Sequence, residues 1–394
     1  MLEIQKFCKE HEDYEILLSQ KPYCITTKHC QNDTRVLFKY NQINSDFSLK
    51  LVRECRGIIL DKRDWSIVCR PYEKFGNYGE GYVPEIDWTT AEVTEKIDGS
   101  LIKVYFFDGE WRVSTNGMIE AHEADIMTPY NGIRNYLDLF SYALHQYGIK
   151  DTRYGGAWNR NICLDLFFDS ISPGENDTFL FELATPLNKV VVPWDAYHIY
   201  PLSIIDNRTG TEVDRDLVEK IFPEFAKVKV YPLTSIEECV QAAKTLPYTE
   251  EGYVVRDKHN NRLKVKSPAY VAVHHIKGEG TLSVKRGIKL IQANEIDEFL
   301  SYFPEYESVI LNIQEAYATL RKVLQADYVT TKWAENLKHS RKDIAIQITK
   351  TRYSPPFCFG VLDKKWSSVA EYLDQARDST LESMVTEFME KQND

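Results

Sequence analysis

The spacing of apolar residues changes once along this chain, near residue 268, and this change limits the folds that it can adopt. Before that point, short apolar or alternating runs are separated by turn signals such as Asp98-Gly99 and Asp108-Gly109, a pattern typical of antiparallel strands. Beyond it, the stretches 308–325, 332–348 and 367–390 have the period of an amphipathic helix. We therefore expect an α+β fold, with antiparallel sheets and flanking helices in a domain over residues 1–267 and an all-helical domain over 268–394.

The first part also contains signals for individual elements. Short apolar runs predict strands that follow one another in an antiparallel meander, at residues 56–60, 66–69, 101–107 and 111–114. A helix is expected over 130–147, and further strands over 179–183 and 199–205. Residues 252–256 and 262–266 are expected to pair as a hairpin across a polar turn.

Length and charge narrow the class of protein. A chain of 394 residues exceeds the usual size of one compact core, which agrees with two domains. The formal net charge of −11 argues against a protein coated in positive charge for indiscriminate nucleic-acid binding, but it leaves room for a local basic groove.

Cysteine usage and the apolar runs indicate a compartment. The eight cysteines form no C-x-x-C pair and no cluster with the spacing of a zinc site, so we interpret them as free thiols in a reducing environment. The first residues lack a basic segment followed by an apolar core, and no apolar run approaches the length that spans a membrane. We expect a soluble, cytoplasmic protein.

The segment Lys96-Ile97-Asp98-Gly99-Ser100 is the first candidate for chemistry. One interpretation is a hairpin turn between two strands. The other places Lys96 at a strand end, where its amine faces a pocket and acts as a nucleophile once it has lost a proton. Burial and neighbouring cations both favour that loss.

A second candidate is a row of basic residues in a predicted strand. Arg262, Lys264 and Lys266 alternate with Leu263 and Val265, so the three cations share one face of the strand. Positive charges with no acid between them suit a polyphosphate, and they would lower the pKa of a nearby lysine. The alternative interpretation is a solvated strand face.

Two carboxylates occur in apolar surroundings. Glu182 lies within the apolar run 179–183, where a charge without a partner is costly, and Glu251 directly precedes the apolar strand at 252–255. Carboxylates at such positions can hold a hydrated Mg²⁺ ion or a ribose hydroxyl. The alternative is a strand-edge charge or a structural ion pair.

Further basic residues occur earlier in the chain. Arg56 precedes a glycine and an apolar strand, and the segment Arg70-Pro71-Tyr72-Glu73-Lys74-Phe75 follows shortly after it. These residues are candidate clamps for the outer phosphates of a nucleoside triphosphate, since arginine offers a fork of donors and lysine a compact charge. Ordinary surface charges are the alternative.

Taken together, these elements give the sequence a family resemblance. Over about residues 50–275 it resembles bacteriophage T4 RNA ligase 1 and its relatives, which belong to the covalent nucleotidyltransferases. Six elements recur in order at compatible spacing: Glu-Cys-Arg-Gly from residue 54, Arg-Pro-x-Glu-Lys-Phe from 70, Lys-x-Asp-Gly-Ser from 96, Phe-Glu-x-x-x-Pro-x-Asn-[Lys/Arg]-x-Val from 181, Glu-Gly-Tyr from 251 and Lys-x-Lys from 264.

The resemblance implies a role for each matched residue. It places the nucleotidyl-accepting lysine at Lys96. The other positions that it implies are the nucleotide- and metal-binding carboxylates Glu182 and Glu251, the catalytic, phosphate-contacting Lys264 and Lys266, the triphosphate-binding Arg56 and Lys74, and Glu95 and Asn116 in the ATP site. One position departs from the pattern, because the chain has Thr115-Asn116-Gly117 where the T4 enzyme has Ser-Lys-Gly. Either Asn116 supplies that contact as a neutral hydrogen-bonding group or another cation takes it over.

The activity implied by the resemblance is that of an ATP-dependent RNA ligase with Mg²⁺, for which Mn²⁺ can substitute. Lys96 would take AMP from ATP, the AMP would pass to an RNA 5′-phosphate, and an RNA 3′-hydroxyl would then displace it. Family members act on single-stranded ends or broken anticodon loops, often beside a polynucleotide kinase and phosphatase. We therefore expect RNA, including cleaved tRNA, as the partner of a monomer that works in the host-cell cytoplasm if a phage encodes it.

Further candidate residues concern the helical part and the contact with adenine. The helical domain is a candidate for recognising the body of a tRNA, and Lys277, Lys285, Arg286 and Lys289 form either an RNA-facing patch or a solvated helix face. Tyr253 and Phe181 are candidates for stacking on the adenine.

Two other functions compete with RNA ligation. A DNA ligase or a GTP-dependent mRNA capping enzyme would be expected to carry an all-β oligonucleotide-binding barrel after its catalytic domain, which the helical pattern beyond residue 280 disfavours. A non-catalytic RNA-binding protein of the same fold would be expected to have lost Lys96, Lys264 or Lys266, and all three are present.

Overall fold

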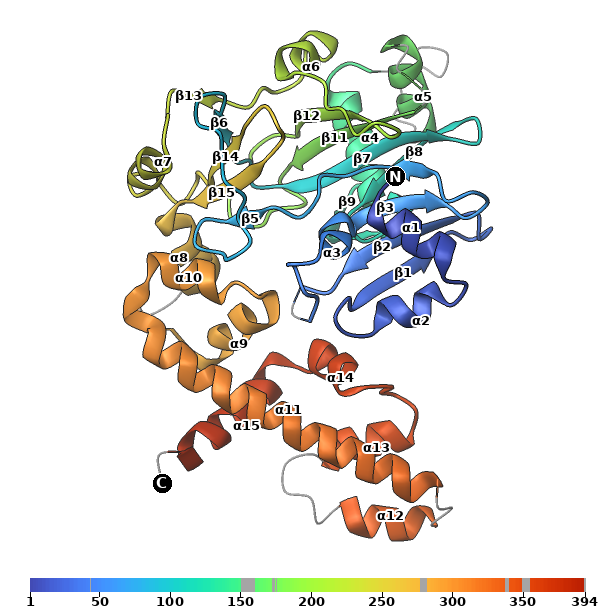
Figure 1. Ribbon diagram of the computed structural model, residues 1–394, viewed down its shortest axis with the longest axis vertical. Coiled ribbons are helices and arrows are strands. Elements are labelled where there is room, and N and C mark those ends of the chain that lie inside the picture. The colour runs from blue at the N-terminus through green and yellow to red at the C-terminus, as the bar shows by residue number, and fades with distance from the viewer. Residues whose placement is uncertain are drawn as a thin grey trace. The chain divides into compact units, whose positions relative to one another are not determined.

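The computed structural model of the chain (Figure 1) describes residues 1–42, 44–149, 160–171, 174, 176–276, 282–336, 340–348 and 355–392. The chain divides into two compact units, Met1–His274 and His275–Asp394. The predicted boundary, between residues 267 and 268, lies at the start of α8 (Pro268–Ile276), and the division falls within that helix.

The first sheet of the first unit is built from N-terminal strands in the antiparallel order β1-β2-β3-β4. Its strands and the helices that pack on one face are β1 (Ile25–His29), β2 (Arg35–Tyr40), β3 (Arg56–Asp61), β4 (Ile67–Cys69), α1 (Glu3–Glu10), α2 (Tyr14–Ser19) and α3 (Lys50–Glu54). Ile4, Leu18 and Phe38 are fully buried in the core between helices and sheet. Burial of each such side chain stabilises the fold by about 1.5–3 kcal/mol.

The second sheet has the antiparallel order β12-β11-β7-β8. Its elements are β7 (Ser100–Phe107), β8 (Glu110–Thr115), β11 (Asp177–Ala184) and β12 (His198–Asp206), with η1 (Ala121–Glu123), the hairpin of β9 (Asp125–Tyr130) and β10 (Ile133–Asn135), and the helices α4 (Tyr136–Gln146), α5 (Arg160–Ile171) and α6 (Arg215–Ile221). The helices cover one face, where the Phe140 and Phe181 rings lie 5.6 Å apart. Since side chains alternate along a strand, Glu182 is directed to the opposite face.

The third sheet has the order β13-β6-β14-β15-β5 and contains the predicted hairpin. Its elements are β5 (Gly76–Asn77), β6 (Glu92–Glu95), β13 (Val230–Tyr231), β14 (Gly252–Arg256) and β15 (Arg262–Lys266), and α7 (Ile236–Ala243) packs on one face. Val255, Leu263 and Val265 are buried against this helix. The alternation predicted for residues 262–266 is therefore confirmed for its apolar members.

The strands of residues 56–115 differ from the predicted meander. β3 and β4 belong to the first sheet, β7 and β8 to the second, and β6 to the third. Because β6 and β7 lie in different sheets, the segment 96–100 is not a hairpin turn but a connection from one sheet to another. The prediction failed here because local patterns show where strands lie and do not specify which strands pair.

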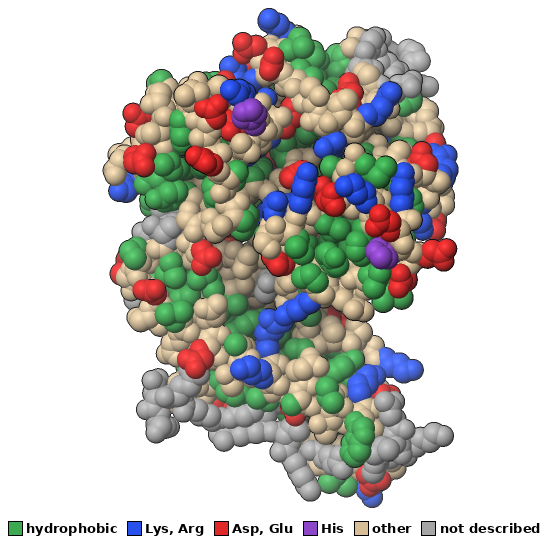
Figure 2. Space-filling view, in the orientation of Figure 1, with side chains coloured by type: hydrophobic (Ala, Val, Ile, Leu, Met, Phe, Trp, Pro, Cys, Tyr) green, Lys and Arg blue, Asp and Glu red, His purple; other side chains and the backbone are tan. Residues whose placement is uncertain are grey.

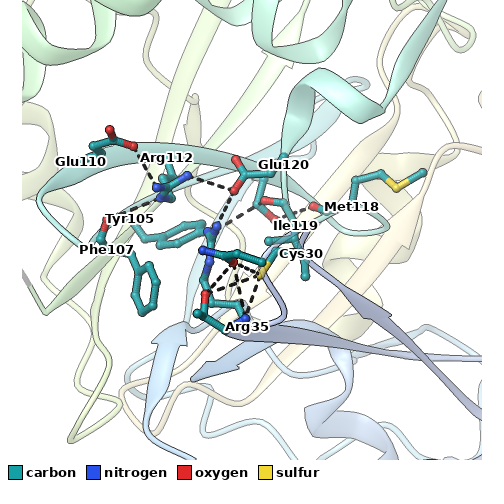
Figure 3. Close-up of polar contacts among 12 residues, drawn as sticks. Cys30, Arg35, Tyr105, Phe107, Glu110, Arg112, Met118, Ile119 and Glu120 are labelled. Atoms are coloured by element: carbon teal, nitrogen blue, oxygen red, sulfur yellow. Dashed lines mark hydrogen bonds and ion pairs between the residues drawn. The ribbon is translucent and has the colours of Figure 1, made fainter. Parts of the chain in front are cut away.

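A buried arginine links the first sheet to the second (Figure 3). From β2, Arg35 donates hydrogen bonds of 2.6 Å to the Tyr105 hydroxyl and of 2.6 Å to Glu120 Oε1, and its guanidinium lies 4.8 Å from the centre of the Phe107 ring. Arg112 on β8 also donates to Glu120 Oε1, at 3.2 Å. These contacts fix β2 relative to the segment that follows β8.

The described elements of the second unit are all helical. They are α9 (Val284–Ala293), α10 (Ile296–Tyr302), η3 (Pro304–Tyr306), α11 (Glu307–Asn336), α12 (Arg341–Ile348), α13 (Pro355–Leu362), α14 (Val369–Gln375) and α15 (Asp378–Gln392). Leu320, Phe357 and Val385 lie in its buried core. The predicted helices at 308–325 and 332–348 differ from this arrangement, because α11 is one helix of 30 residues and α12 follows separately.

The charged surface and the cysteines can be compared with what the composition of the chain predicted. Figure 2 shows lysine and arginine side chains interspersed with carboxylates over the face that it presents. The cysteines whose side chains are described are free thiols. Within the described ranges, no helix is both long and apolar enough to cross a bilayer.

Candidate active site

A cavity of about 300 Å³ lies between the polar faces of the second and third sheets, and Arg215 at the start of α6 also lines it. Its volume is at the lower end of the range typical of ligand sites. Six of the predicted site residues line it: Arg56, Glu95, Lys96, Asn116, Glu182 and Lys264. The structure therefore brings together residues that lie up to about 200 positions apart in the chain.

Strand alternation explains how charged residues come to face this cavity. On β15, Leu263 and Val265 enter the core under α7, and Lys264 between them lines the cavity. On β11, Phe181 packs under α4, and the next residue, Glu182, lines the cavity from the other side. Each sheet thus buries one face against helices and presents its polar face to the same space.

Lys96 follows the last residue of β6 and is held at both its backbone and its side chain. Its backbone N–H donates to the Gly252 carbonyl at 2.8 Å, and its Nζ lies 2.7 Å from Glu251 Oε1. Gly252 has φ +139°, and a Cβ there would lie 2.1 Å from the Val265 carbonyl oxygen. Only glycine fits this approach, which brings Lys96 and Glu251 together at the start of β14.

The residues after Lys96 are anchored by a buried carboxylate. Asp98 is 4% exposed and accepts hydrogen bonds from the backbone N–H groups of Val191 and Val192, at 2.9 and 2.6 Å. Its second oxygen accepts from the Tyr270 hydroxyl at 2.9 Å. Nearby, Asn188 donates to the Ser100 hydroxyl at 3.0 Å. Two of the sequence motifs, 96–100 and 181–191, therefore bind each other directly.

Glu182 has a strongly perturbed carboxyl group. Burial raises its pKa from an ordinary 4.5 to about 8, and the negative charges of Glu251 and Asp98 act in the same direction. The positive charges of Lys96 and Arg56 oppose the shift without cancelling it. A cation placed near Glu182 and Glu251 would relieve this repulsion.

The chemistry of the pair Glu182 and Glu251 fits a magnesium ion better than a metal held by the protein alone. Among the residues that the structure describes, no group of three or more His, Cys, Asp or Glu side chains could hold a metal ion. Mg²⁺ commonly binds one or two carboxylates and completes its shell with water and substrate phosphates. The two carboxylates therefore suit a metal that arrives with a nucleotide.

Arg56 and Lys264 both lie near an aromatic ring that sequence reasoning did not single out. The Arg56 guanidinium is 5.4 Å and the Lys264 Nζ 5.2 Å from the centre of the Phe75 ring. Arg56 Nη1 is buried, and no described residue forms a hydrogen bond with it. The position of Phe75 at the end of the Arg-Pro-x-Glu-Lys-Phe motif was the available signal.

Three predicted phosphate-binding residues lie elsewhere or have partners. Lys74 does not line the cavity, because it is buried with its Nζ 5.1 Å from the Phe47 ring centre. Lys266 is 9% exposed at the end of β15, opposite Gly252, and is also absent from the lining. Arg262 lines the cavity but pairs with Glu212, so the expectation that its charge is available to a polyphosphate is wrong.

The two candidates for adenine stacking are both wrong. Tyr253 packs in the core of the third sheet, 4.9 Å from Tyr231, and Phe181 packs in the core of the second. The rings that line the cavity are those of Tyr72 and Phe75. Side chains alternate between the two faces of a strand, and those of Tyr253 and Phe181 lie on the faces that helices cover, away from the cavity.

The remaining predicted positions are Glu95, Asn116 and the basic residues of the helical unit. Burial raises the pKa of Glu95 at the cavity wall, and the charge of Lys229 opposes that shift. Asn116 Oδ1 is buried without a hydrogen-bond partner among the described residues. In the helical unit, Lys285 and Lys289 lie 3.3 and 2.6 Å from Asp378, whereas Lys277 falls outside the described residues.

The chain is similar to known proteins in sequence and can be aligned with solved structures. Residues 54–270 match the sequence pattern of the RNA ligase family. The chain is 31% identical over 297 residues to a putative bifunctional polynucleotide kinase/RNA ligase of Autographa californica nuclear polyhedrosis virus, covering 72% of this chain and 39% of that protein. It is 23% identical over 352 residues to an RNA ligase of Rhodothermus phage RM378, covering 75% of each. An archaeal ATP-dependent RNA ligase of known structure aligns over 79% of each chain with 12% identity and a TM-score of 0.42.

Proposed function

Because this chain belongs to the T4 RNA ligase 1 family, we propose that it is an ATP-dependent RNA ligase that joins a 5′-phosphate to a 3′-hydroxyl through an AMP adduct on Lys96. The observation that carries this proposal is the convergence at one cavity of a lysine amine, two carboxylates and further cations. Lys96, Glu182, Arg56 and Lys264 all line it, and Glu251 contacts the lysine.

The first step is attack of the Lys96 amine on the α-phosphorus of ATP. A nitrogen–phosphorus bond forms, the bond to the β-phosphate oxygen breaks, and pyrophosphate leaves. The amine must lose a proton to react, and the Glu251 carboxylate at 2.7 Å is placed to accept it. Arg56 and Lys264 are placed to offset negative charge on the departing phosphates.

A divalent cation bound by Glu182 and Glu251 would supply further charge neutralisation on the phosphates. Glu251 also forms an ion pair with Lys96, and burial favours the protonated form of Glu182 near neutral pH, because it raises the pKa of that carboxyl group to about 8.

The second and third steps transfer the nucleotide to RNA and seal the strand. A 5′-phosphate oxygen attacks the AMP phosphorus, which breaks the bond to Lys96 and forms a pyrophosphate link between AMP and RNA. A 3′-hydroxyl then attacks the activated 5′-phosphorus, AMP leaves, and a phosphodiester remains. The same cations can serve each step, because negative charge develops at neighbouring phosphates each time.

The decisive experiment is incubation of the purified protein with α-labelled ATP and Mg²⁺, followed by denaturing electrophoresis. We expect an acid-labile protein–AMP adduct that Lys96→Ala abolishes. Lys244→Ala, which changes an exposed lysine on the end of α7, serves as the matched control and should retain the adduct. Label from GTP but not from ATP would favour a capping enzyme, and no adduct from either would favour a non-catalytic RNA-binding protein.

We further propose that the substrates are broken RNA strands, including cleaved tRNA, and that the helical unit contributes to their recognition. The name of the viral relative joins a polynucleotide kinase to an RNA ligase, which supports an end-healing kinase acting before this protein. Ligation of a nicked anticodon stem-loop should exceed ligation of a nicked DNA duplex of the same sequence. Equal rates on both would contradict the assignment to RNA.

A further inference from the structure

A second cavity adjoins the one that contains Lys96 and shares two residues with it. It has a volume of about 500 Å³ and lies beside β1 and β2. Arg56 and Asn116 line both cavities. Lys28, Lys39 and Gly117 line the second one alone.

The charge of the second cavity is one-sided. Lys28, Lys39 and Arg56 contribute three cations, and none of them forms an ion pair with a carboxylate in the part of the chain that the structure describes. Partial removal from water and the positive charge of Lys28 lower the pKa of Lys39. Like charges held together without counter-ions are costly unless an anion joins them.

The fold brings Lys39 against the segment 115–117. A Cβ at Gly117 would lie 3.4 Å from Lys39 Nζ. Gly57, with φ +86°, packs so closely that a Cβ there would lie 2.7 Å from the Asn116 carbonyl oxygen. The Arg35 contacts with Tyr105 and Glu120 hold β2 in this position, since Arg35 and Lys39 belong to the same strand.

Two polar atoms between the cavities lack partners. Arg56 Nη1 and Asn116 Oδ1 are both buried, and neither has a hydrogen bond to any residue that the structure describes. Buried donors and acceptors are nearly always paired, so orphaned ones mark a place where a ligand or water completes the bonding. A guanidinium donor in a basic cavity selects an anionic acceptor such as a phosphate oxygen.

We propose that Lys39, with Lys28 and Arg56, forms a phosphate-binding subsite next to the Lys96 cavity, and that Lys39 supplies the positive charge that is missing at Asn116. This inference rests on the proposed ligase function. The bound phosphate comes either from the β,γ end of ATP, which leaves as pyrophosphate, or from the 5′ end of the RNA. Both sources offer the same chemistry to the three cations.

The test separates these sources by measuring the steps of ligation one at a time. The variants are Lys39→Ala, the charge-preserving Lys39→Arg, and Lys9→Ala as a control in an exposed lysine of α1. If the phosphate belongs to ATP, Lys39→Ala should slow adduct formation at limiting ATP, and the reverse discharge by pyrophosphate, by about 10-fold or more. If it belongs to RNA, the same loss should appear in AMP transfer from isolated adduct to 5′-phosphorylated RNA.

A second variant keeps the proposal falsifiable if Lys39→Ala affects folding. Adding Asn116→Lys to Lys39→Ala restores a cation at the neighbouring position and should recover most of the lost rate. Lys39→Arg should retain nearly full activity. A loss shared by Lys39→Arg and not recovered by Asn116→Lys would show a structural role and overturn the proposal, as would unchanged rates in all the steps.

Direct binding provides a readout that does not depend on ligation. Calorimetric titration with inorganic pyrophosphate should give binding to the wild-type protein that Lys39→Ala weakens by about 10-fold and Lys9→Ala leaves unchanged. If the wild-type protein forms no AMP adduct but shows this pattern, the proposed function fails and the subsite stands. If it forms the adduct but Lys39→Ala changes neither pyrophosphate binding nor any step, the subsite fails alone.

Discussion

Two clefts of the first unit contain charged residues, and they differ in the surroundings of their glutamates. The cleft beside Arg35 has a volume of about 490 Å³, and its arginines Arg35 and Arg112 are both bonded to Glu120. The cavity beside Lys96 is smaller, about 300 Å³, but burial raises the pKa of its Glu182 carboxyl group to about 8. A glutamate whose protonated form is favoured by burial, rather than a larger volume, therefore distinguishes the candidate active site.

The largest effect is expected from a substitution that removes the hydrogen bonds of the cleft beside Arg35. Arg35→Ala removes a buried guanidinium and leaves Glu120 and Tyr105 without their main partner, so we expect a loss of about 3 kcal/mol in the free energy of unfolding. Chemical denaturation measures it. Arg63→Ala, which removes an exposed arginine bonded to Asp61, is the control and should cost much less, because solvent screens an exposed ion pair. Equal losses of stability in both variants would show that the buried Arg35 contributes no more to the fold than an exposed ion pair does.

The next effect concerns activity rather than stability. Lys264→Ala removes a cation from the Lys96 cavity, and we expect adduct formation to slow by about 100-fold, which corresponds to about 2.7 kcal/mol. Lys258→Ala, in the exposed turn of the same hairpin, should leave the rate unchanged. A circular-dichroism spectrum of an unfolded protein for Lys264→Ala would instead make this lysine structural.

A smaller effect should appear in the pH dependence of stability. Since the pKa of Glu182 is raised to about 8 from 4.5, the folded protein retains between these values a proton that the unfolded chain has released. The associated stability is present below pH 4.5 and is lost as pH rises through about 8. Relative to Glu182→Gln, the wild-type protein should lose on the order of 1 kcal/mol between pH 6 and pH 9.

Adding Mg²⁺ to the stability measurement tests whether Glu182 binds a metal. At pH 8, Mg²⁺ should raise the thermal midpoint of the wild-type protein more than that of Glu182→Gln, because a cation at this site replaces the bound proton. Glu110→Gln, at an exposed carboxylate of β8, should behave like the wild type. An identical response from Glu182→Gln would exclude Glu182 as a metal-binding residue.

The smallest effect is expected in the helical unit. Lys289 forms an exposed ion pair with Asp378, so Lys289→Ala should change the free energy of unfolding by less than about 0.5 kcal/mol. If the helix face binds RNA, ligation of a tRNA substrate should lose affinity while adduct formation stays constant. No change in RNA affinity would identify the pair as a solvated surface contact.

Sequence reasoning succeeded where one strand determined the outcome. The alternation in 262–266 correctly placed Leu263 and Val265 in the core and Lys264 on the other face. It failed where a residue far away in the sequence determines the surroundings of a side chain. Arg262 is an example, because its partner Glu212 lies 50 positions away. The surroundings of Lys74 could not be predicted for the same reason, because the rings near its Nζ include Tyr40 and Phe47 from earlier segments.

The ends of helices show a different limit of prediction from sequence. The stretch 307–336 contains neither glycine nor proline, so nothing in its backbone chemistry ends the helix where the apolar period weakens. Periodicity divided this stretch between two predicted helices, whereas the structure continues one helix through it. The period of apolar residues reports which face is buried, and the absence of helix breakers governs how far the helix continues.

The contacts of Asp98 have a consequence for how the protein is made. This single carboxylate accepts hydrogen bonds from residues 93, 94 and 172 positions later in the chain. A growing polypeptide cannot complete that set before Tyr270 has left the ribosome, although Lys96 emerges much earlier. The reactive lysine therefore reaches its working position only after almost the whole first unit has been synthesised, and a nascent or truncated chain that ends before residue 270 would carry the lysine without an assembled site.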